Sequence, residues 1–468
     1  MSKRLLDRRW PWLAAAAAVV LIFLSTVLEI RAPGDWDDRP LGSVDDIETL
    51  RDRDDLNVLF VVIDTLRAER LGSYGYVRDT SPVLDRMTAS GVRFARHLAQ
   101  SSWTKASMVS LWTGLYPTRT GITRFDQVIP QEARMPAEIL REAGFQTVGL
   151  YRNGWVAPTF GFDQGFEVYQ RPTKAPLPPG VRRENPTLSD AGTDEDVVAA
   201  AVEFLRIRGR ERWFLYLHLM DVHEYLYDEE SALFGIRYSD VYDNAIRWTD
   251  GVMGFLLSSL ADLGYLDQTL IVVTSDHGEA FGERGLEGHA RKVYRETTEI
   301  PLFLFFPFRL EPGSVVETRT SNVDVWPTVL DLLGLEMPQP DGRSRLPEVL
   351  ASARGEAPTD AAEPAIAHLD QTWARPKMAS RHTVAVSEGT LRYVRVEQES
   401  GVIEQLYDAN GDPREVRDRA REDPDTLERL AALADAYLEL RPDWGEAPTR
   451  QIGELELNHL RALGYALP

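Results

Sequence analysis

The feature that most constrains the fold of this chain is a set of short, continuous apolar runs bounded by polar or turn-forming residues. Five of them lie at 58–63, 147–151, 214–219, 270–274 and 302–306. Their length and their β-branched and aromatic content favour strands that are buried on both faces. Strands of this kind occur in parallel sheets that helices cover on both sides.

Helical patterns with start and stop signals lie between these runs. Pro82 follows Ser81 at the start of one pattern, and further patterns lie at 136–143, 194–208 and 327–333, each followed by a glycine. Because strands and helices alternate, we predict an α/β domain with a mostly parallel sheet flanked by helices. We expect this domain to cover residues 56–375.

The last part of the chain has a different pattern. Residues 383–386 and 391–398 read as two strands about a turn, and helices are expected near 424–440 and 455–463. We therefore predict a small antiparallel α+β subdomain with a helical tail at residues 376–468.

The N-terminus has the pattern of a membrane segment. Lys3, Arg4, Arg8 and Arg9 precede an uncharged run of 19 residues at 10–28, close to the length that spans a bilayer. We predict an anchor within residues 1–30, an acidic linker at 31–55, and a domain outside the cytoplasm, periplasmic or extracellular. A cleaved signal peptide is the alternative, and it leads to the same location.

Composition excludes several functions. The chain has 52 Lys and Arg against 73 Asp and Glu, a net charge of −21, and phosphate-backbone affinity needs clustered basic residues. We therefore expect no nucleic-acid partner. The chain has no cysteine, which excludes disulfides, Cys-ligated zinc, iron–sulfur clusters and a thiol nucleophile.

Two of the predicted strands end in acids. Asp64 follows the run 58–63, and Asp276, His277 and Gly278 follow the run 270–274. The carboxyl ends of strands in a doubly wound sheet form the ligand crevice, so these groups are expected to converge. A single Asp at a strand end is usually a turn residue or a helix cap. An Asp followed by His also offers adjacent oxygen and nitrogen ligands for a metal.

Further polar residues add to this pattern. Thr104 lies where a helix-like stretch begins, and unpaired amides at a helix N-terminus stabilise anions. The alternative is that Thr104 only caps the helix. Four of the eight histidines, His218, His223, His277 and His289, lie in or after strand-like runs. This clustering indicates a polar site, although a histidine inside a strand is often structural.

Motifs along most of the chain resemble those of one family. They lie at 57–67, 113–119, 217–223, 274–279, 323–328 and 406–413. Together they resemble the sulfatase-like proteins of the alkaline phosphatase superfamily. The resemblance implies an alkaline-phosphatase-like fold and an ester hydrolase or transferase.

The resemblance also implies roles for particular residues. Asp64, Asp276 and His277 match metal-ligand positions, and Thr104 matches the position of a nucleophile that also contacts the metal. His223 and His289 match positions that contact the ester oxyanion, assist the leaving group or, in some relatives, hold a second metal.

The chain departs from the formylglycine sulfatases. These proteins carry Cys or Ser at the nucleophile position, followed by Pro and Arg at the places where this chain has Ala106 and Met108. We therefore do not expect formylglycine. Thr65 stands at a position where sulfatases often have a second acidic ligand, and Glu69 stands where many close relatives have Asp.

Arg67, Lys105 and His218 are the candidate substrate-binding residues. Arg67 lies just after Asp64, and Lys105 is next to Thr104. The alternatives are a structural ion pair for Arg67, a solvated side chain for Lys105 and a structural role for His218.

The function we expect is a membrane-anchored, metal-dependent hydrolase or transferase that cleaves phosphate esters through Thr104 and a phosphothreonine intermediate. Carboxylate and imidazole ligands suit Zn or Mn better than Ca. Relatives with Thr at this position handle phosphate esters, and the substrate is expected on a lipid headgroup or a glycan. Two alternatives remain: sulfate ester hydrolysis without formylglycine, and a tethered binding protein without catalysis. The ester, the number of metals and the oligomeric state stay open.

Overall fold

The computed structural model describes residues 37–172, 192–357 and 363–462. The folded unit that contains every element discussed below begins at Arg39. The predicted membrane segment at residues 10–28 lies outside the described residues. None of the helices within them combines the length and the apolar character that a bilayer span requires.

A mostly parallel sheet forms the centre of this unit, as predicted. Within the described residues it has eight strands in the order β12-β2-β11-β7-β1-β6-β4-β5, and β11 alone runs against the others. The strands are β1 Asn57–Ile63, β2 Val92–Phe94, β4 Gln146–Leu150, β5 Val168–Gln170, β6 Trp213–Leu219, β7 Thr269–Thr274, β11 Leu302–Phe305 and β12 Ser314–Val316. All five predicted strands are present.

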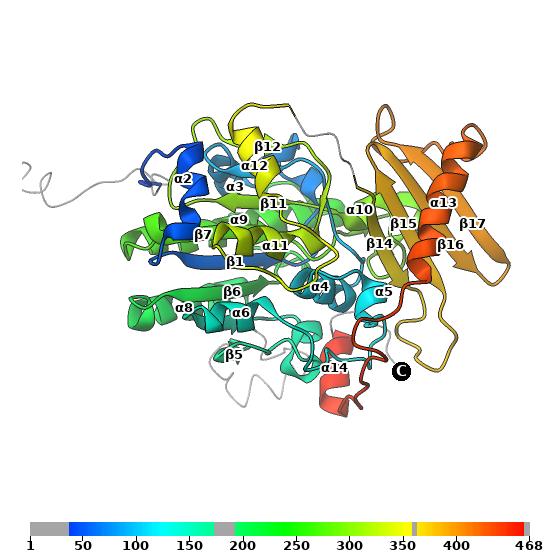
Figure 1. Ribbon diagram of the computed structural model, residues 1–468, viewed down its shortest axis with the longest axis horizontal. Coiled ribbons are helices and arrows are strands. Elements are labelled where there is room, and N and C mark those ends of the chain that lie inside the picture. Colours follow the sequence, from blue (N-terminus) through cyan, green and yellow to red (C-terminus); the bar gives the residue numbers. More distant parts are fainter. Residues whose placement is uncertain (1–36, 173–191, 358–362, 463–468) are drawn as a thin grey trace, which may run out of the picture. The chain divides into compact units, whose positions relative to one another are not determined.

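The two faces of β1 explain why its apolar run is continuous. Every residue of β1 is buried, and helices cover both faces of the sheet. On one face, α4 Thr104–Thr113 and α11 Asn322–Leu332 pack together over Phe60. The ring of Phe60 stacks on Trp326 at 4.8 Å between centroids, and Trp326 stacks on Trp112 at 5.3 Å. This aromatic stack fixes α4 beside the end of β1 (Figure 1).

The remaining helices of the main domain pack on one another or on the sheet. The helices α8 and α9 pack on each other, and α3 packs on α9. The bounds of these elements are α2 Val44–Glu48, α3 Pro82–Thr88, α5 Pro117–Thr120, α6 Pro136–Glu142, α8 Asp194–Arg208, α9 Tyr238–Asp262, α10 Arg295–Thr298 and α12 Leu346–Ala353. Short strands are β3 His97–Leu98, β8 Ala280–Phe281, β9 Glu287–Gly288, β10 Glu299–Ile300 and β13 Thr320–Ser321.

The helix that was predicted to start at Pro327 starts earlier. In α11 the helical residues begin at Asn322, and Pro327 lies inside the helix. Ser321 is the N-cap, and its amide donates to Asp324 Oδ2 at 2.9 Å in a capping box. This side-chain cap sets the start of the helix, and the proline signal does not.

The C-terminal part is an antiparallel sheet covered by a helix (Figure 1). Its strands are β14 Ala365–Asp370, β15 His382–Glu388, β16 Leu391–Gln398 and β17 Gly401–Asp408. The helix α13 Pro424–Leu438 packs Leu430 and Ala434 on Val384 and Tyr393 of this sheet. The helix α14 Glu454–Ala462 follows. The sheet begins at Ala365, eleven residues before the predicted start of the subdomain at 376.

The prediction of an acidic linker at 31–55 is wrong from Arg39 onward, because this part of the segment belongs to the folded unit. Arg39 is buried and donates to the carbonyl of Phe306 at 2.7 Å. Ile47 and Leu50 are each 1% exposed and belong to the main hydrophobic core. Ile47 lies in α2, and Leu50 begins the short 3₁₀ helix that follows it. The acidic composition of the segment concealed these two apolar anchors.

The buried position of Leu50 gives a stability prediction. We expect Leu50→Ala to lower the free energy of unfolding by roughly 2–5 kcal/mol, because it leaves a cavity in the core. The matched control is Glu48→Ala, which removes an exposed ion pair with Arg354 and should cost less than about 1 kcal/mol. Urea denaturation measures both changes. Equal stability of Leu50→Ala and the wild type would mean that this segment is not part of the fold.

Candidate active site

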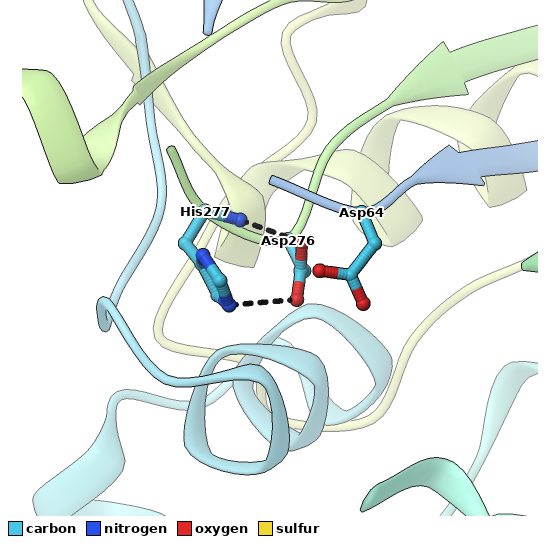
Figure 2. A group of neighbouring side chains, drawn as sticks. All are labelled: Asp64, Asp276 and His277. Atoms are coloured by element: carbon cyan, nitrogen blue, oxygen red, sulfur yellow. Dashed lines mark hydrogen bonds and ion pairs between the residues drawn. The ribbon is translucent and has the colours of Figure 1, made fainter. Parts of the chain in front are cut away.

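Two neighbouring strands bring together three groups that are far apart in sequence. Asp64 follows β1, and Asp276 and His277 follow β7, which pairs with β1 in parallel. One ligand atom from each residue lies within 4.8 Å of the others. Figure 2 shows the three side chains converging. All three are fully buried, as expected for residues at the carboxyl ends of covered strands.

The chemistry of this triad fits a divalent cation. Asp64 Oδ1 and Asp276 Oδ2 are buried oxygens that accept no hydrogen bond from the described residues. Burial, and then the charge of Asp64, raise the pKa of Asp276 above its usual range. A bound cation would satisfy both oxygens and remove this repulsion. Two carboxylates with one imidazole suit Zn or Mn.

The tautomer of His277 agrees with a ligand role. Its Nδ1 lies 3.0 Å from the carbonyl oxygen of Gly278, which accepts a hydrogen bond and so assigns the ring proton to Nδ1. The lone pair of Nε2 then faces the site, 3.2 Å from Asp276 Oδ2 and 3.1 Å from Thr104 Oγ1. A backbone carbonyl that orients a metal-ligating histidine in this way is common.

Thr104 is the first residue of α4 and points its hydroxyl at the triad. Trp103 is the N-cap, so Thr104 does not cap the helix. Besides its contact with His277, the Thr104 hydroxyl lies 3.4 Å from Asn153 Nδ2, which also donates to Asp64 Oδ2 at 2.6 Å. The amides and dipole of the helix N-terminus favour negative charge at this oxygen.

Two histidines form the more exposed side of the cluster. The rings of His277 and His289 stack at 4.6 Å between centroids, and those of His289 and His223 lie at 5.0 Å. Burial lowers the pKa of His223 to about 4. Burial also lowers the pKa of His289, but the charge of Glu279 and its hydrogen bond outweigh this effect and raise that pKa above the ordinary value. Their surroundings therefore bias the two imidazoles in opposite directions, His223 toward the neutral form and His289 toward the protonated form.

His218 supports Asp64 from behind. Its Nε2 lies 2.9 Å from Asp64 Oδ2, and its Nδ1 lies 2.7 Å from the hydroxyl of Tyr216. Burial tends to raise the pKa of Asp64, but the hydrogen bond with His218 holds that pKa below its usual range. Both nitrogens of His218 are engaged inside the fold, so the structural alternative describes this residue and a substrate contact does not.

Arg67 and Lys105 also have structural partners. Arg67 is buried, pairs with Glu69, and lies 2.8 Å from Glu283 Oε1. This is the ion pair that was the alternative to a substrate contact. Lys105 is neither solvated nor directed at Thr104, because its Nζ donates to the carbonyl oxygens of Phe125 and Gln127 at 2.6 and 2.7 Å.

The sequence prediction missed Asn153 and Glu279. Asn153 comes three residues after β4, and its signal is the same as that of Asp64, a polar residue after a buried strand. Glu279 follows His277 by two residues, and its Oε2 lies 3.0 Å from His289 Nδ1. Thr65 also has a role, because its amide donates to Asp276 Oδ1 at 3.1 Å from a backbone with φ +61°. This conformation is strained for a β-branched residue.

Comparison with known proteins agrees with this geometry. The family model described as Sulfatase matches residues 56–335, which is more than half of the chain. The chain belongs to the sulfatase family. A second model, described as N-sulphoglucosamine sulphohydrolase, C-terminal, matches residues 282–441 of this sulfatase-family chain. The predicted family and the enzyme class, an ester hydrolase, are confirmed.

Individual relatives of this sulfatase-family protein are distant. Arylsulfatase K of Xenopus laevis is 30% identical over 187 residues, which are 39% of this chain and 33% of that protein. The N-acetylgalactosamine-6-O-sulfatase of Bacteroides thetaiotaomicron is 23% identical over 483 residues, covering 81% of this chain and 92% of that protein. The crystal structure of the phosphonate monoester hydrolase of Agrobacterium radiobacter has a TM-score of 0.62 at 20% identity, covering 82% of this chain and 95% of that one, and confirms the fold.

The contacts of Lys105 predict a structural role. We expect Lys105→Met to lower the free energy of unfolding by about 2–5 kcal/mol, because two buried carbonyl groups lose their donor. The control is Lys377→Met at an exposed position, which should change stability by less than about 0.5 kcal/mol. Thermal and urea denaturation measure both. Unchanged stability together with a raised KM would instead support the substrate contact that the sequence suggested.

Proposed function

We propose that this sulfatase-family protein cleaves phosphate or phosphonate esters, with Thr104 as the nucleophile. The observation that carries the proposal is the position of the Thr104 hydroxyl, which is buried at a helix N-terminus and 3.1 Å from His277 Nε2 beside a metal-competent triad. A nucleophile needs a neighbour that favours its alkoxide form. The triad and the helix N-terminus supply that environment.

The identity of the nucleophile favours phosphorus over sulfur. Formylglycine is an aldehyde made from Cys or Ser, whereas oxidation of Thr104 would give a ketone because its β-carbon carries a methyl group. The chain also has no cysteine at any position. An unmodified hydroxyl suits phosphoryl transfer, in which positioning and charge stabilisation supply most of the catalysis.

The reaction proceeds in two displacements. Thr104 Oγ1 forms a bond to phosphorus while the bond to the leaving oxygen breaks, and the electron pair departs with that oxygen. His289 supplies a proton to it, and His223 contacts the non-bridging oxygens. Water, or an acceptor alcohol, then attacks the phosphothreonine, which gives hydrolysis or transfer.

Asp64, Asp276 and His277 would hold the divalent ion of this proposal, with Thr104 next to it. Such an ion supplies positive charge that favours the alkoxide and neutralises a non-bridging oxygen. Asn153 orients Asp64 and the Thr104 hydroxyl together through its two contacts at 2.6 and 3.4 Å. His218 holds the other side of Asp64.

We place the reaction outside the cytoplasm, on a lipid headgroup or a glycan. The support for this location is the basic cluster and the apolar run at 10–28. The support for a glycan is the name of a relative that covers most of the chain, an N-acetylgalactosamine-6-O-sulfatase. The same relative favours the second candidate function, sulfate ester hydrolysis without formylglycine.

Turnover of four matched 4-nitrophenyl esters tests the proposal: a phosphate monoester, a phosphate diester, a phosphonate monoester and a sulfate, each with added Zn or Mn. We expect turnover of at least one phosphorus ester, a fall in kcat/KM on the order of 10³-fold in Thr104→Ala, and retention within about tenfold in Thr104→Ser. Ser110→Ala removes a hydroxyl from the same helix, away from the site, and should leave the rate unchanged.

Other outcomes assign the alternatives. Faster turnover of the sulfate ester than of the phosphorus esters would support the alternative, sulfate ester hydrolysis without formylglycine. A phosphorus-ester rate that persists in Thr104→Ala would exclude this nucleophile. A folded, metal-loaded protein that turns over none of the four esters would support the binding protein without catalysis.

A further inference from the structure

Glu279 and His289 form a buried carboxylate–imidazole pair next to the triad. Glu279 Oε2 lies 3.0 Å from His289 Nδ1, and Glu279 is only 2% exposed. No family motif used above assigns a role to this carboxylate. Its position, two residues after His277, places it on the loop that leaves the site.

The backbone builds this pair into the fold. The loop forms a two-stranded hairpin in which Ala280 pairs with Gly288 and Phe281 pairs with Glu287. Continuing this register by one step places residue 279 opposite residue 289. The two ends of the hairpin are also tied down, because Gly278 N donates to Thr297 O at 3.0 Å and Ala290 N donates to Ser102 O at 2.6 Å.

The hydrogen bond determines which nitrogen of His289 faces the substrate. An ionised carboxylate only accepts hydrogen bonds, so the proton of this contact belongs to Nδ1. Nε2 is then the nitrogen that exchanges a proton. The ring of His289 stacks on His277, whose Nε2 contacts Thr104, so His277 is the residue that links His289 to the proposed nucleophile.

We propose that Glu279 is a positioning residue that holds His289 as the leaving-group acid, with Nε2 directed to the reacting ester. This inference rests on the proposed function. As the bond from phosphorus to the leaving oxygen breaks, the proton of His289 Nε2 moves to that oxygen. The other ring proton stays on Nδ1, hydrogen-bonded to Glu279. In the second displacement, neutral Nε2 takes a proton from the attacking water or alcohol, which restores the starting state.

The leaving group distinguishes this role from a merely structural one. Phosphorus esters of 4-nitrophenol, phenol and methanol have increasingly basic leaving oxygens, which depend increasingly on an acid. We expect Glu279→Gln to lower kcat/KM by less than about fivefold for the 4-nitrophenyl ester and by about 100-fold or more for the methyl ester. Glu287→Gln, at an exposed position on the same hairpin, should leave all three within about twofold.

A double-mutant cycle with His289→Ala locates the effect. If Glu279 acts through His289, adding Glu279→Gln to His289→Ala should change the leaving-group dependence no further. Glu279→Asp keeps the carboxylate and should restore part of the methyl-ester rate, which guards against a folding defect in the Gln variant. A loss of equal size for all three esters, or additive losses in the cycle, would overturn the proposal.

A measurement that does not depend on turnover tests the positioning of His289 independently of the proposed function. In protein labelled with 15N-histidine, which has eight histidines in all, we expect the His289 signals to show a proton on Nδ1 in the wild type and a changed proton distribution in Glu279→Gln. Absence of ester turnover with this tautomer present would reject the proposed function but keep the positioning. A wild-type His289 without a proton on Nδ1 would reject the positioning itself.

Discussion

The repulsion between two buried carboxylates is the constraint on which the rest of the site depends. Asp64 and Asp276 end adjacent strands, are fully buried, and each has an oxygen with no hydrogen bond from the described residues. Isolated buried charges of this kind are costly unless hydrogen bonds or a cation compensate them. Asn153 and His218 donate to Asp64, and the strained backbone at Thr65 aims an amide at Asp276. The negative charge that these donors leave unbalanced fits a divalent ion at this site.

The fold serves this arrangement by fixing one helix against one sheet. The aromatic stack from Phe60 through Trp326 to Trp112 holds α4 over β1. As a consequence, Thr104 at the first position of α4 faces the ends of β1 and β7. A rigid scaffold of this kind can hold the Thr104 hydroxyl, the proposed nucleophile, to within a fraction of an ångström, which loops alone rarely achieve.

Sequence patterns predicted the parts of the site that follow buried strands. A polar residue after a continuous apolar run is a local signal, and it marked Asp64, Asp276 and His277 as candidates for the site. His218 contacts Asp64, and Lys105 contacts the carbonyl groups of residues 125 and 127. Such long-range contacts leave no periodic pattern in the sequence. The sequence also did not identify Ile47 and Leu50 as core residues. Two apolar residues in an acidic segment become informative only when the core they enter is known.

The metal content of the purified protein, compared with that of Asp64→Asn and Asp276→Asn, is the decisive measurement for this site. We expect roughly one Zn or Mn ion per wild-type chain and a large loss of metal in both variants, because each substitution removes one anionic ligand. Unfolding by urea, compared with and without a chelator, should show that the metal stabilises the wild type more than either variant. A wild-type protein that binds neither ion, or variants that bind the ion as tightly as the wild type, would show that Asp64 and Asp276 do not form a metal site.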